Sequence, residues 1–360
     1  MKRFFFTPGP SQLYFTVEEH LKSALTENVP SISHRSAAFQ EIYRHTTDLL
    51  KELFRLPAGY HIFFTGSATE IWERSIQNLV EYESCHFVNG AFSQRYAGIA
   101  ENLGRKTSVI RVSEGKVVDV ESVLITESCE LIALTQNETS TGASHALGDV
   151  EKIRKGFPNQ LISLDIVSCA PYSNIDYSLV DMAYLSVQKC FGLPAGLGVW
   201  IANERCIQKS ETLLGKGMSI GSYHSLPELL AKSQKNQTPE TPNVLGIYLL
   251  GKVAEDMLAK GLDMIRREID YKAAVLYNAF EKSEFLSPFV KDPAHQSKTT
   301  LVAEVAVLSR VILNKLAEKG MIIGSGYGPF KERHIRIANF PTHSKEQVEV
   351  LADELLMIGK

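Results

Sequence analysis

Two patterns of apolar positions alternate along the chain: short apolar runs of strand length, and longer segments in which apolar residues recur every three or four positions. The predicted strands are His61–Phe64, Cys85–Val88, Ser108–Val112, Leu131–Thr135, Leu161–Ser168, Ala183–Val187, Val199–Ala202, 299–305, 321–323 and 334–338. The predicted helices are Val17–Thr26, Phe39–Phe54, Glu70–Leu79, Ser93–Leu103, Val150–Gly156, Val244–Ala259, Met264–Phe280, 309–319 and 344–357. Strands that alternate with helices predict an α/β fold built on a mostly parallel sheet.

The same pattern divides the chain into an N-terminal arm and two domains. Residues 1–15 are expected to form an extended arm, residues 16–245 a large domain, and residues 246–360 a small C-terminal α+β domain. Residues 215–243 are rich in glycine, serine, lysine and proline without periodicity, which predicts a long loop. The helix Val244–Ala259 that follows is expected to bridge into the small domain.

Composition excludes several classes of protein. The 360 residues carry a net charge of −3, and no basic tract of the kind that binds nucleic acid stands out. No apolar run is long enough to span a bilayer, and Pro8 and Pro10 interrupt the apolar N-terminal run before it could serve as a signal peptide. These features predict a soluble, cytoplasmic protein.

Metal and nucleotide sites also lack their usual signals. The five cysteines contain no C-x-x-C pair, and the ten histidines contain no H-E-x-x-H pattern, so no metal is expected. The stretch Gly215-Lys216-Gly217 lacks the serine or threonine of a phosphate-binding P-loop. The glycines of 324–328 do not follow the dinucleotide-binding spacing.

Candidate chemistry lies at two strand ends. Lys189 follows the strand Ala183–Val187, and Asp165 lies near the carboxyl end of the strand Leu161–Ser168. The 24 residues between them (189 − 165) leave room for one strand–connection–strand unit, so both side chains can reach one pocket. An amine that can bond an aldehyde, beside an acid that can keep a pyridine nitrogen protonated, suits pyridoxal phosphate chemistry. A purely structural Asp–Lys ion pair is the alternative.

A second candidate feature is the small-residue loop Thr65-Gly66-Ser67-Ala68-Thr69, which lies between a predicted strand and a predicted helix. Free amides and the dipole at a helix N-terminus attract anions, and small residues allow a phosphate to approach. Alternatively, Ser67 or Thr69 simply caps its own helix.

Several short motifs extend these features over nearly the whole chain. They are Thr7-Pro8-Gly9-Pro10, Ser33-His34-Arg35, Gly66-Ser67-Ala68-Thr69, Gln136-Asn137-Glu138-Thr139, Asp165-Ile166-Val167-Ser168, Ser186-Val187-Gln188-Lys189 and Arg336. In this order and spacing they resemble the class V aminotransferases of fold type I, with the phosphoserine aminotransferases as the most similar branch. The resemblance implies pyridoxal 5'-phosphate as cofactor, a homodimer with shared active sites, and amino acid and 2-oxo acid substrates.

The resemblance also implies a fold and a role for each site residue. A large domain would hold a mostly parallel seven-stranded sheet between helices, with Val199–Ala202 antiparallel at its far side, beside the small α+β domain. Lys189 and Asp165 would be catalytic. The implied cofactor-binding residues are Ser67, Ala68, Thr69, Phe92, Thr139, Asp165, Val167, Gln188, Lys189 and, reaching from a neighbouring subunit, Thr241. Arg336 would bind the substrate α-carboxylate, and His34 and Arg35 would bind an anion across the dimer.

Two departures from the resemblance concern the substrate. Ala68 stands where the phosphoserine enzymes carry an arginine, and residues 328–333 lack their His-Arg pair, with only Lys331 and Arg333 as loose substitutes. The predicted reaction is transamination between phosphoserine and 2-oxoglutarate, in serine biosynthesis. A class V transaminase of serine or alanine with glyoxylate or pyruvate stays open as the alternative.

A desulfurase-type lyase is a less favoured alternative. Those relatives carry histidines where this chain has Phe92 and Gln188, and they need a cysteine in the second domain, whereas the last cysteine here is Cys206. A descendant without activity is disfavoured because Lys189 and Asp165 are both present.

Overall fold

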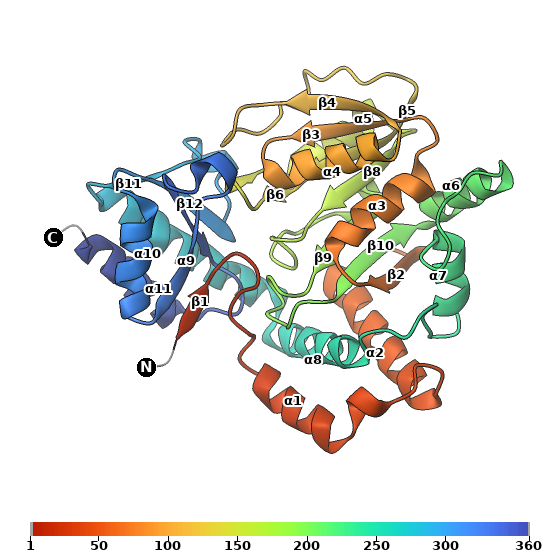
Figure 1. Ribbon diagram of the computed structural model, residues 1–360, viewed down its shortest axis with the longest axis horizontal. Coiled ribbons are helices and arrows are strands. Elements are labelled where there is room, and N and C mark those ends of the chain that lie inside the picture. The colour runs from red at the N-terminus through yellow and green to blue at the C-terminus, as the bar shows by residue number, and fades with distance from the viewer. Residues whose placement is uncertain (1–2, 359–360) are drawn as a thin grey trace.

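The computed structural model describes residues 3–358, which form two large β-sheets and a small two-stranded one, with helices packed against the large sheets (Figure 1). The predicted arm begins with residues 1–2 and the predicted small domain ends with residues 359–360, and these four residues lie outside the described ones. Within residues 3–358, no helix combines the length and the apolar character that crossing a membrane requires.

The larger sheet has seven strands in the order β2-β10-β9-β8-β5-β3-β4. Its strands are β2 (Tyr60–Thr65), β3 (Glu83–Val88), β4 (Lys106–Arg111), β5 (Cys129–Thr135), β8 (Leu161–Asp165), β9 (Met182–Ser186) and β10 (Gly198–Asn203). Strands β9, β8, β5, β3 and β4 pair in parallel, which confirms the predicted mostly parallel sheet. Strand β10 is antiparallel to both neighbours, but it lies second from the edge, with β2 outside it.

Helices cover both faces of this sheet. They are α1 (Val17–Thr26), α2 (Ala37–Phe54), α3 (Ala68–Leu79), α4 (Ala91–Asn102), α5 (Leu147–Gly156), α6 (Glu204–Gly215), α7 (Leu226–Ser233) and α8 (Val244–Lys260). Alternate strand residues face opposite cores: Ile62 and Phe64 pack with α2 and α8, whereas Phe63 packs with α3 and α6. The two-residue strands β6 (Asn137–Glu138) and β7 (Ala143–Ser144) form a hairpin beside the sheet.

The smaller sheet has five strands in the order β1-β13-β14-β12-β11. Its elements are β1 (Phe4–Phe6), β11 (Leu286–Pro288), β12 (Thr300–Val305), β13 (Met321–Ser325) and β14 (His334–Ala338), with helices α9 (Leu262–Lys282), α10 (Ser309–Glu318) and α11 (Lys345–Met357). Strand β1 comes from the predicted extended arm and pairs in parallel with β13. Phe4–Phe6 therefore belong to the sheet that the C-terminal strands form (Figure 1).

Residues 215–243 differ from the prediction of a loop, because α7 occupies Leu226–Ser233 within them. Leu226 and Leu229 are buried in the core formed with α3 and α6, and Leu230 packs against it. These leucines follow helical spacing, but the segment is only about two turns long, and its polar flanks conceal the pattern. Helix α6 was likewise not predicted.

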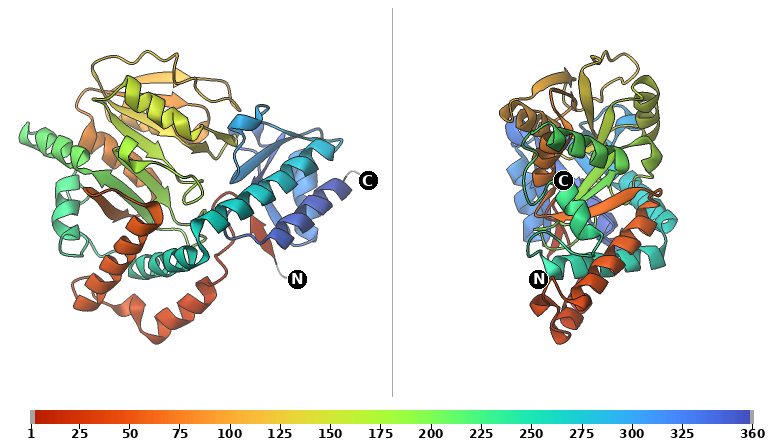
Figure 2. Two further views of the ribbon diagram at one scale, coloured as in Figure 1. Left: turned by 180° about the vertical axis from the view of Figure 1, so that it is seen from behind. Right: turned by 90° about the vertical axis from the view of Figure 1, so that its right-hand side faces the viewer.

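The helix that connects the two large sheets also differs from the predicted one. Helix α8 packs in the core of the larger sheet, whereas α9 contributes Ile265 and Ile269 to that core and Leu276 and Phe280 to the core of the smaller sheet. The bridging helix is therefore α9 rather than α8, and Figure 2 shows the two helices following one another toward the C-terminal elements. The domain boundary between residues 245 and 246 stays a prediction.

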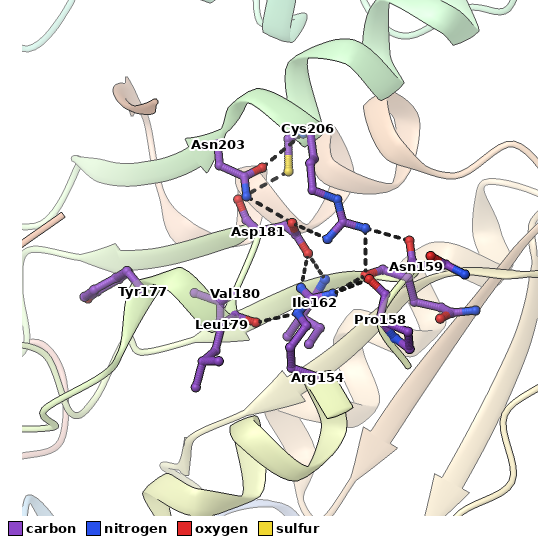
Figure 3. Close-up of polar contacts among 12 residues, drawn as sticks. Arg154, Pro158, Asn159, Ile162, Tyr177, Leu179, Val180, Asp181, Asn203 and Cys206 are labelled. Carbon is purple, nitrogen blue, oxygen red and sulfur yellow. Dashed lines mark hydrogen bonds and ion pairs between the residues drawn. The ribbon is translucent and has the colours of Figure 1, made fainter. Parts of the chain in front are cut away.

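Asp181 directly precedes β9 and lies at the end of the larger sheet opposite to the carboxyl ends of its parallel strands. Its buried carboxylate lies 2.5 Å from the Arg154 guanidinium and accepts hydrogen bonds from Ile162 N–H at 2.8 Å, Asn203 Nδ2 at 3.0 Å and Arg205 Nη1 at 3.0 Å (Figure 3). A buried carboxylate is stable only when its oxygens are paired in this way. This network joins β8, β9 and β10 with α5 and α6.

Candidate active site

A cavity of about 100 Å³ lies where the larger sheet's parallel strands end. In an open α/β sheet, loops that leave neighbouring strands at this edge diverge and leave a crevice. The cavity is lined by Ala68, Thr69, Trp72, Phe92, Thr135, Asn137, Thr139, Asp165, Val167, Ser186, Gln188 and Lys189. Eight of the predicted cofactor residues therefore meet at one place: Ala68, Thr69, Phe92, Thr139, Asp165, Val167, Gln188 and Lys189.

Lys189 lies three residues after β9 and is buried. Its ammonium donates a hydrogen bond to Thr139 Oγ1 at 3.0 Å and lies 5.2 Å from the centre of the Phe92 ring. Burial lowers the pKa of Lys189 to about 8, although Asp165 opposes this shift. An amine with this pKa is partly neutral near neutral pH, as a nucleophile or a proton acceptor must be.

Asp165 is the last residue of β8, and its carboxylate faces the same cavity. Its Oδ1 accepts a hydrogen bond from Val167 N–H at 2.9 Å, and burial raises its pKa to about 7. The predicted strand Leu161–Ser168 thus ends at Asp165, because the backbone turns there to make this contact. Val167, which the predicted strand Leu161–Ser168 included, reaches the cavity from this turn instead.

The small-residue loop leads into α3 as predicted, and Ser67 caps the helix. Its Oγ accepts a hydrogen bond from Glu70 N–H at 3.2 Å, and the hydroxyl proton stays available for a second contact. Ala68 N–H donates to Ser186 Oγ at 2.9 Å, which joins the helix start to the end of β9. A side chain at Gly198 would meet the Ser67 backbone at 2.6 Å, so only glycine lets β10 approach the loop this closely.

Glu138, which belongs to the motif 136–139 but had no predicted role, fixes the position of Phe92. Its buried carboxylate accepts hydrogen bonds from Ser93 N–H at 3.0 Å and from Ser140 Oγ at 2.6 Å, with a longer contact of 3.4 Å from Phe92 N–H. A carboxylate is favoured at a helix N-terminus, here that of α4. The signal available in the sequence was its place next to Thr139 at a predicted strand end.

Arg336 on β14 approaches the cavity from the smaller sheet. Its Nε donates to Ser325 O at 2.8 Å and its Nη1 makes a longer contact with Thr139 O at 3.4 Å. The Tyr327 ring lies 5.3 Å from the Arg336 guanidinium and 5.2 Å from the Phe92 ring, so Tyr327 links the two sheets across the site. Tyr327 also lines a larger cavity of about 420 Å³. The sequence did not single out Tyr327.

The N-terminal arm passes over the lysine loop. Ser11 N–H donates to Gln188 O at 3.1 Å, and Tyr14 N–H donates to Gly192 O at 2.9 Å. Gly9 has a φ of +116°, and a side chain there would meet the methylenes of Lys189 at 3.0 Å. The motif containing Gly9 therefore packs directly on the predicted catalytic lysine.

His34, Arg35 and Thr241 do not line this cavity. Arg35 is exposed, and its guanidinium donates to Gln237 Oε1 and Thr238 O, both at 2.8 Å, and to Pro239 O at 3.1 Å. These three predicted residues are therefore held on one surface of the same chain. Lys331 and Arg333 are exposed and also line no part of the cavity.

Comparison with known proteins places the chain in a family. The model of the aminotransferase class-V family matches residues 3–332. The chain belongs to the class-V aminotransferase family.

Several aminotransferases of known structure or sequence are similar to the chain. A phosphoserine aminotransferase structure from Cytophaga hutchinsonii ATCC 33406 is 47% identical, with 98% of both chains covered and a TM-score of 0.97. A phosphoserine aminotransferase of Rhodococcus opacus (strain B4) is 28% identical over 353 residues, which are 96% of this chain and 92% of that protein. The structure of a subgroup IV aspartate aminotransferase from Thermus thermophilus shares the fold, with 23% identity, a TM-score of 0.85, and 99% and 98% of the two chains covered.

The aminotransferase assignment confirms pyridoxal phosphate as the expected cofactor, and the cavity suits it chemically. A buried amine of lowered pKa can bond the aldehyde. A cation placed beside the buried Asp165 carboxyl would offset its desolvation and lower its pKa again, as a protonated pyridine nitrogen can. The start of α3 supplies the positive end of a helix dipole on the same cavity. The donor set thus matches an aldehyde, a ring nitrogen and a phosphate.

Proposed function

We propose that this aminotransferase transfers the amino group of phosphoserine to 2-oxoglutarate, as a step of serine biosynthesis. The observation that carries the proposal is a cavity lined by Lys189 and Asp165, with Arg336 in contact with Thr139 of that lining, in a chain 47% identical to a phosphoserine aminotransferase. Lys189 and Asp165 supply the chemistry, and Arg336 supplies a guanidinium for the α-carboxylate of an amino acid.

The proposed roles follow from each residue's position. When bound, pyridoxal phosphate draws electrons away from the substrate's α-carbon and so acidifies its proton. Lys189 holds the cofactor and then carries a proton to and from that carbon, with Thr139 Oγ1 orienting the amine at 3.0 Å. Asp165 stabilises a positive charge on the ring nitrogen, and Phe92 covers the ring. Arg336 binds the α-carboxylate through guanidinium N–H groups other than the Nε–H that Ser325 accepts.

The phosphate subsites complete the proposal. Ser67, Ala68, Thr69 and Gln188, with Thr241 of a second copy, are proposed to bind the cofactor phosphate. His34 and Arg35 of that second copy are proposed to bind the substrate phosphate, because guanidinium geometry matches two phosphate oxygens. Their location outside their own chain's cavity supports a homodimer with shared sites.

Hybrid dimers test the shared site. Mixing Lys189→Ala protein with Arg35→Ala protein should restore activity, because one of the two sites in each hybrid keeps both groups. Hybrids that stay inactive, or a wild-type monomer with full activity at high dilution, would contradict the shared site. The same mixture made with Lys189→Ala protein alone is the control.

The substrate proposal is tested by comparing amino donors. The ratio of kcat/KM for phosphoserine over that for serine or alanine should lie far above one and should collapse in Arg35→Ala, which removes a charge-assisted contact worth roughly 1.5–3 kcal/mol. Ala68 is the observation that favours the alternative, a small-amino-acid transaminase. A ratio near or below one, unchanged in Arg35→Ala, would select that alternative.

We also propose a cytoplasmic location. All five cysteines are buried and unpaired in the structure, which suits a reducing compartment. Recovery of the activity mainly in a membrane or secreted fraction of the source cells would contradict this location.

A further inference from the structure

His224 bridges two carboxylates beside the predicted phosphate loop. It is buried in the segment before α7, where its Nδ1 hydrogen-bonds to Glu70 on α3 and its Nε2 donates to Glu240 Oε2 at 3.0 Å. A carboxylate only accepts hydrogen bonds, so both ring nitrogens must carry protons and His224 is a cation in this arrangement. The two glutamates correspondingly raise the pKa of His224 to about 9, against the opposing effect of burial.

Each carboxylate in this bridge connects to a loop with a proposed role in phosphate binding. Glu70 Oε2 accepts from Gly66 N–H at 2.9 Å, so the carboxylate that binds His224 also holds the loop before α3. Glu240 lies next to Thr241, in the segment whose Thr238 and Pro239 carbonyls bind Arg35. His224 therefore ties the phosphate loop of its own chain to the segment proposed to reach the second copy.

The charges around His224 come from three elements. Arg74 on α3 lies 3.8 Å from Glu70, and its guanidinium is 5.9 Å from the ring of Tyr223. His34, on the loop before α2, interacts electrostatically with Glu240. Loss of the His224 charge would leave Glu240 without its hydrogen-bonded cation, so the segment 237–241 would lose this attachment to α3.

We propose that His224 is a positioning residue for phosphate recognition, because its bridge between Glu70 and Glu240 holds the loop 66–69 and the segment 237–241 in their binding arrangement. The inference rests on the proposed pyridoxal phosphate enzyme. It predicts that loss of His224 weakens binding of the cofactor's phosphate group, and that this loss can be measured separately from any change in binding of the cofactor's ring.

The test compares binding of pyridoxal phosphate with binding of pyridoxal, which lacks the phosphate, to apoenzyme by absorbance titration. In His224→Ala the affinity ratio of the two compounds should fall about tenfold or more, since a charge-assisted contact positions the phosphate site. The control is His61→Gln, which removes a histidine–carboxylate contact of 2.7 Å to Glu204 at the far end of β2 and should leave the ratio unchanged. The wild-type ratio should also fall as the pH rises through about 9, where His224 loses its proton.

A second variant covers the case in which His224→Ala does not fold. Glu240→Gln keeps the shape and one hydrogen bond but removes a charge, and it should lower the same ratio by a smaller factor. A folded variant of either kind with the wild-type ratio would overturn the inference. Wild-type protein that binds neither compound, or that does not transaminate phosphoserine, would instead refute the proposed function.

Discussion

Lys189 Nζ donates a hydrogen bond to Thr139 Oγ1 at 3.0 Å, and through it the end of β9 contacts the turn after β6. The Thr139 carbonyl oxygen also accepts a longer contact of 3.4 Å from Arg336 Nη1. One threonine thus links the proposed catalytic amine with the proposed carboxylate-binding arginine. This shared contact holds the amine and the guanidinium close to one another at the site.

Asp165→Asn should leave the cofactor bound but slow the removal of the substrate's α-proton by about a hundredfold or more, because a neutral amide cannot stabilise a charged ring nitrogen. The measurement is the single-turnover rate with α-deuterated and ordinary phosphoserine. Asp149→Asn, which alters a carboxylate paired with His145 at 3.1 Å, is the control. Turnover of Asp165→Asn at the wild-type rate would show that Asp165 does not serve the ring.

Tyr327→Ala should raise KM for the amino acid about tenfold and change kcat much less, because the Tyr327 ring supports the Arg336 guanidinium at 5.3 Å. Tyr327→Phe keeps the ring and should behave like wild type. Tyr82, which has Lys106 at 5.6 Å from its ring and lies on the surface, provides the control variant Tyr82→Ala. Equal losses in Tyr327→Phe and Tyr327→Ala would mean that the hydroxyl acts instead of the ring.

Asp181→Asn should lower the free energy of unfolding by roughly 3–5 kcal/mol, since it breaks a buried ion pair with Arg154 and leaves that guanidinium uncompensated. Urea denaturation measures the change. The kcat of the folded variant should stay near that of wild type, because Asp181 precedes β9 and Lys189 follows it, so the two lie at opposite ends of the strand. A large loss of kcat without loss of stability would contradict this separation.

Lys272 predicts a pH dependence of stability. It is buried, donates to Phe340 O at 2.9 Å and His343 O at 2.8 Å, and burial lowers its pKa from 10.5 to about 7. Between those two values the unfolded chain binds more protons than the folded one, so this residue makes the free energy of unfolding rise with pH. The free energy of unfolding of wild type minus that of Lys272→Met should therefore rise from pH 7 to pH 9.5. A difference that is flat or falls over this range would contradict the burial of a lowered-pKa amine.

The strand ends explain why much of the site could be predicted from sequence. Lys189 and Asp165 each follow an apolar run closely, and parallel strands necessarily bring their carboxyl ends to one edge. The loop before α3 was predicted in the same way, since it follows a strand, whereas Phe92 and Thr139 were implied only by the family resemblance. Local pattern and parallel topology were enough for Lys189, Asp165 and that loop.

Other contacts could not be predicted because they join residues far apart in the sequence. The pairing of β1 with β13 brings Phe4 beside Met321, and His224 meets Glu70 across 154 residues. No periodicity encodes such pairs, which arise only when the two sheets and their loops are packed. Helix α7 was missed for a related reason, because its stability comes from burial against α3 and α6 and not from its own short pattern.

The most direct test of the account is to reduce the holoenzyme with borohydride and map the peptide that keeps the cofactor. Lys272 is a demanding internal comparison, because it is also buried and its pKa is also lowered. The account predicts the added mass on the peptide containing Lys189 alone, and no labelled peptide in Lys189→Ala. Label on Lys272 or on any other lysine, or label that persists in Lys189→Ala, would contradict it.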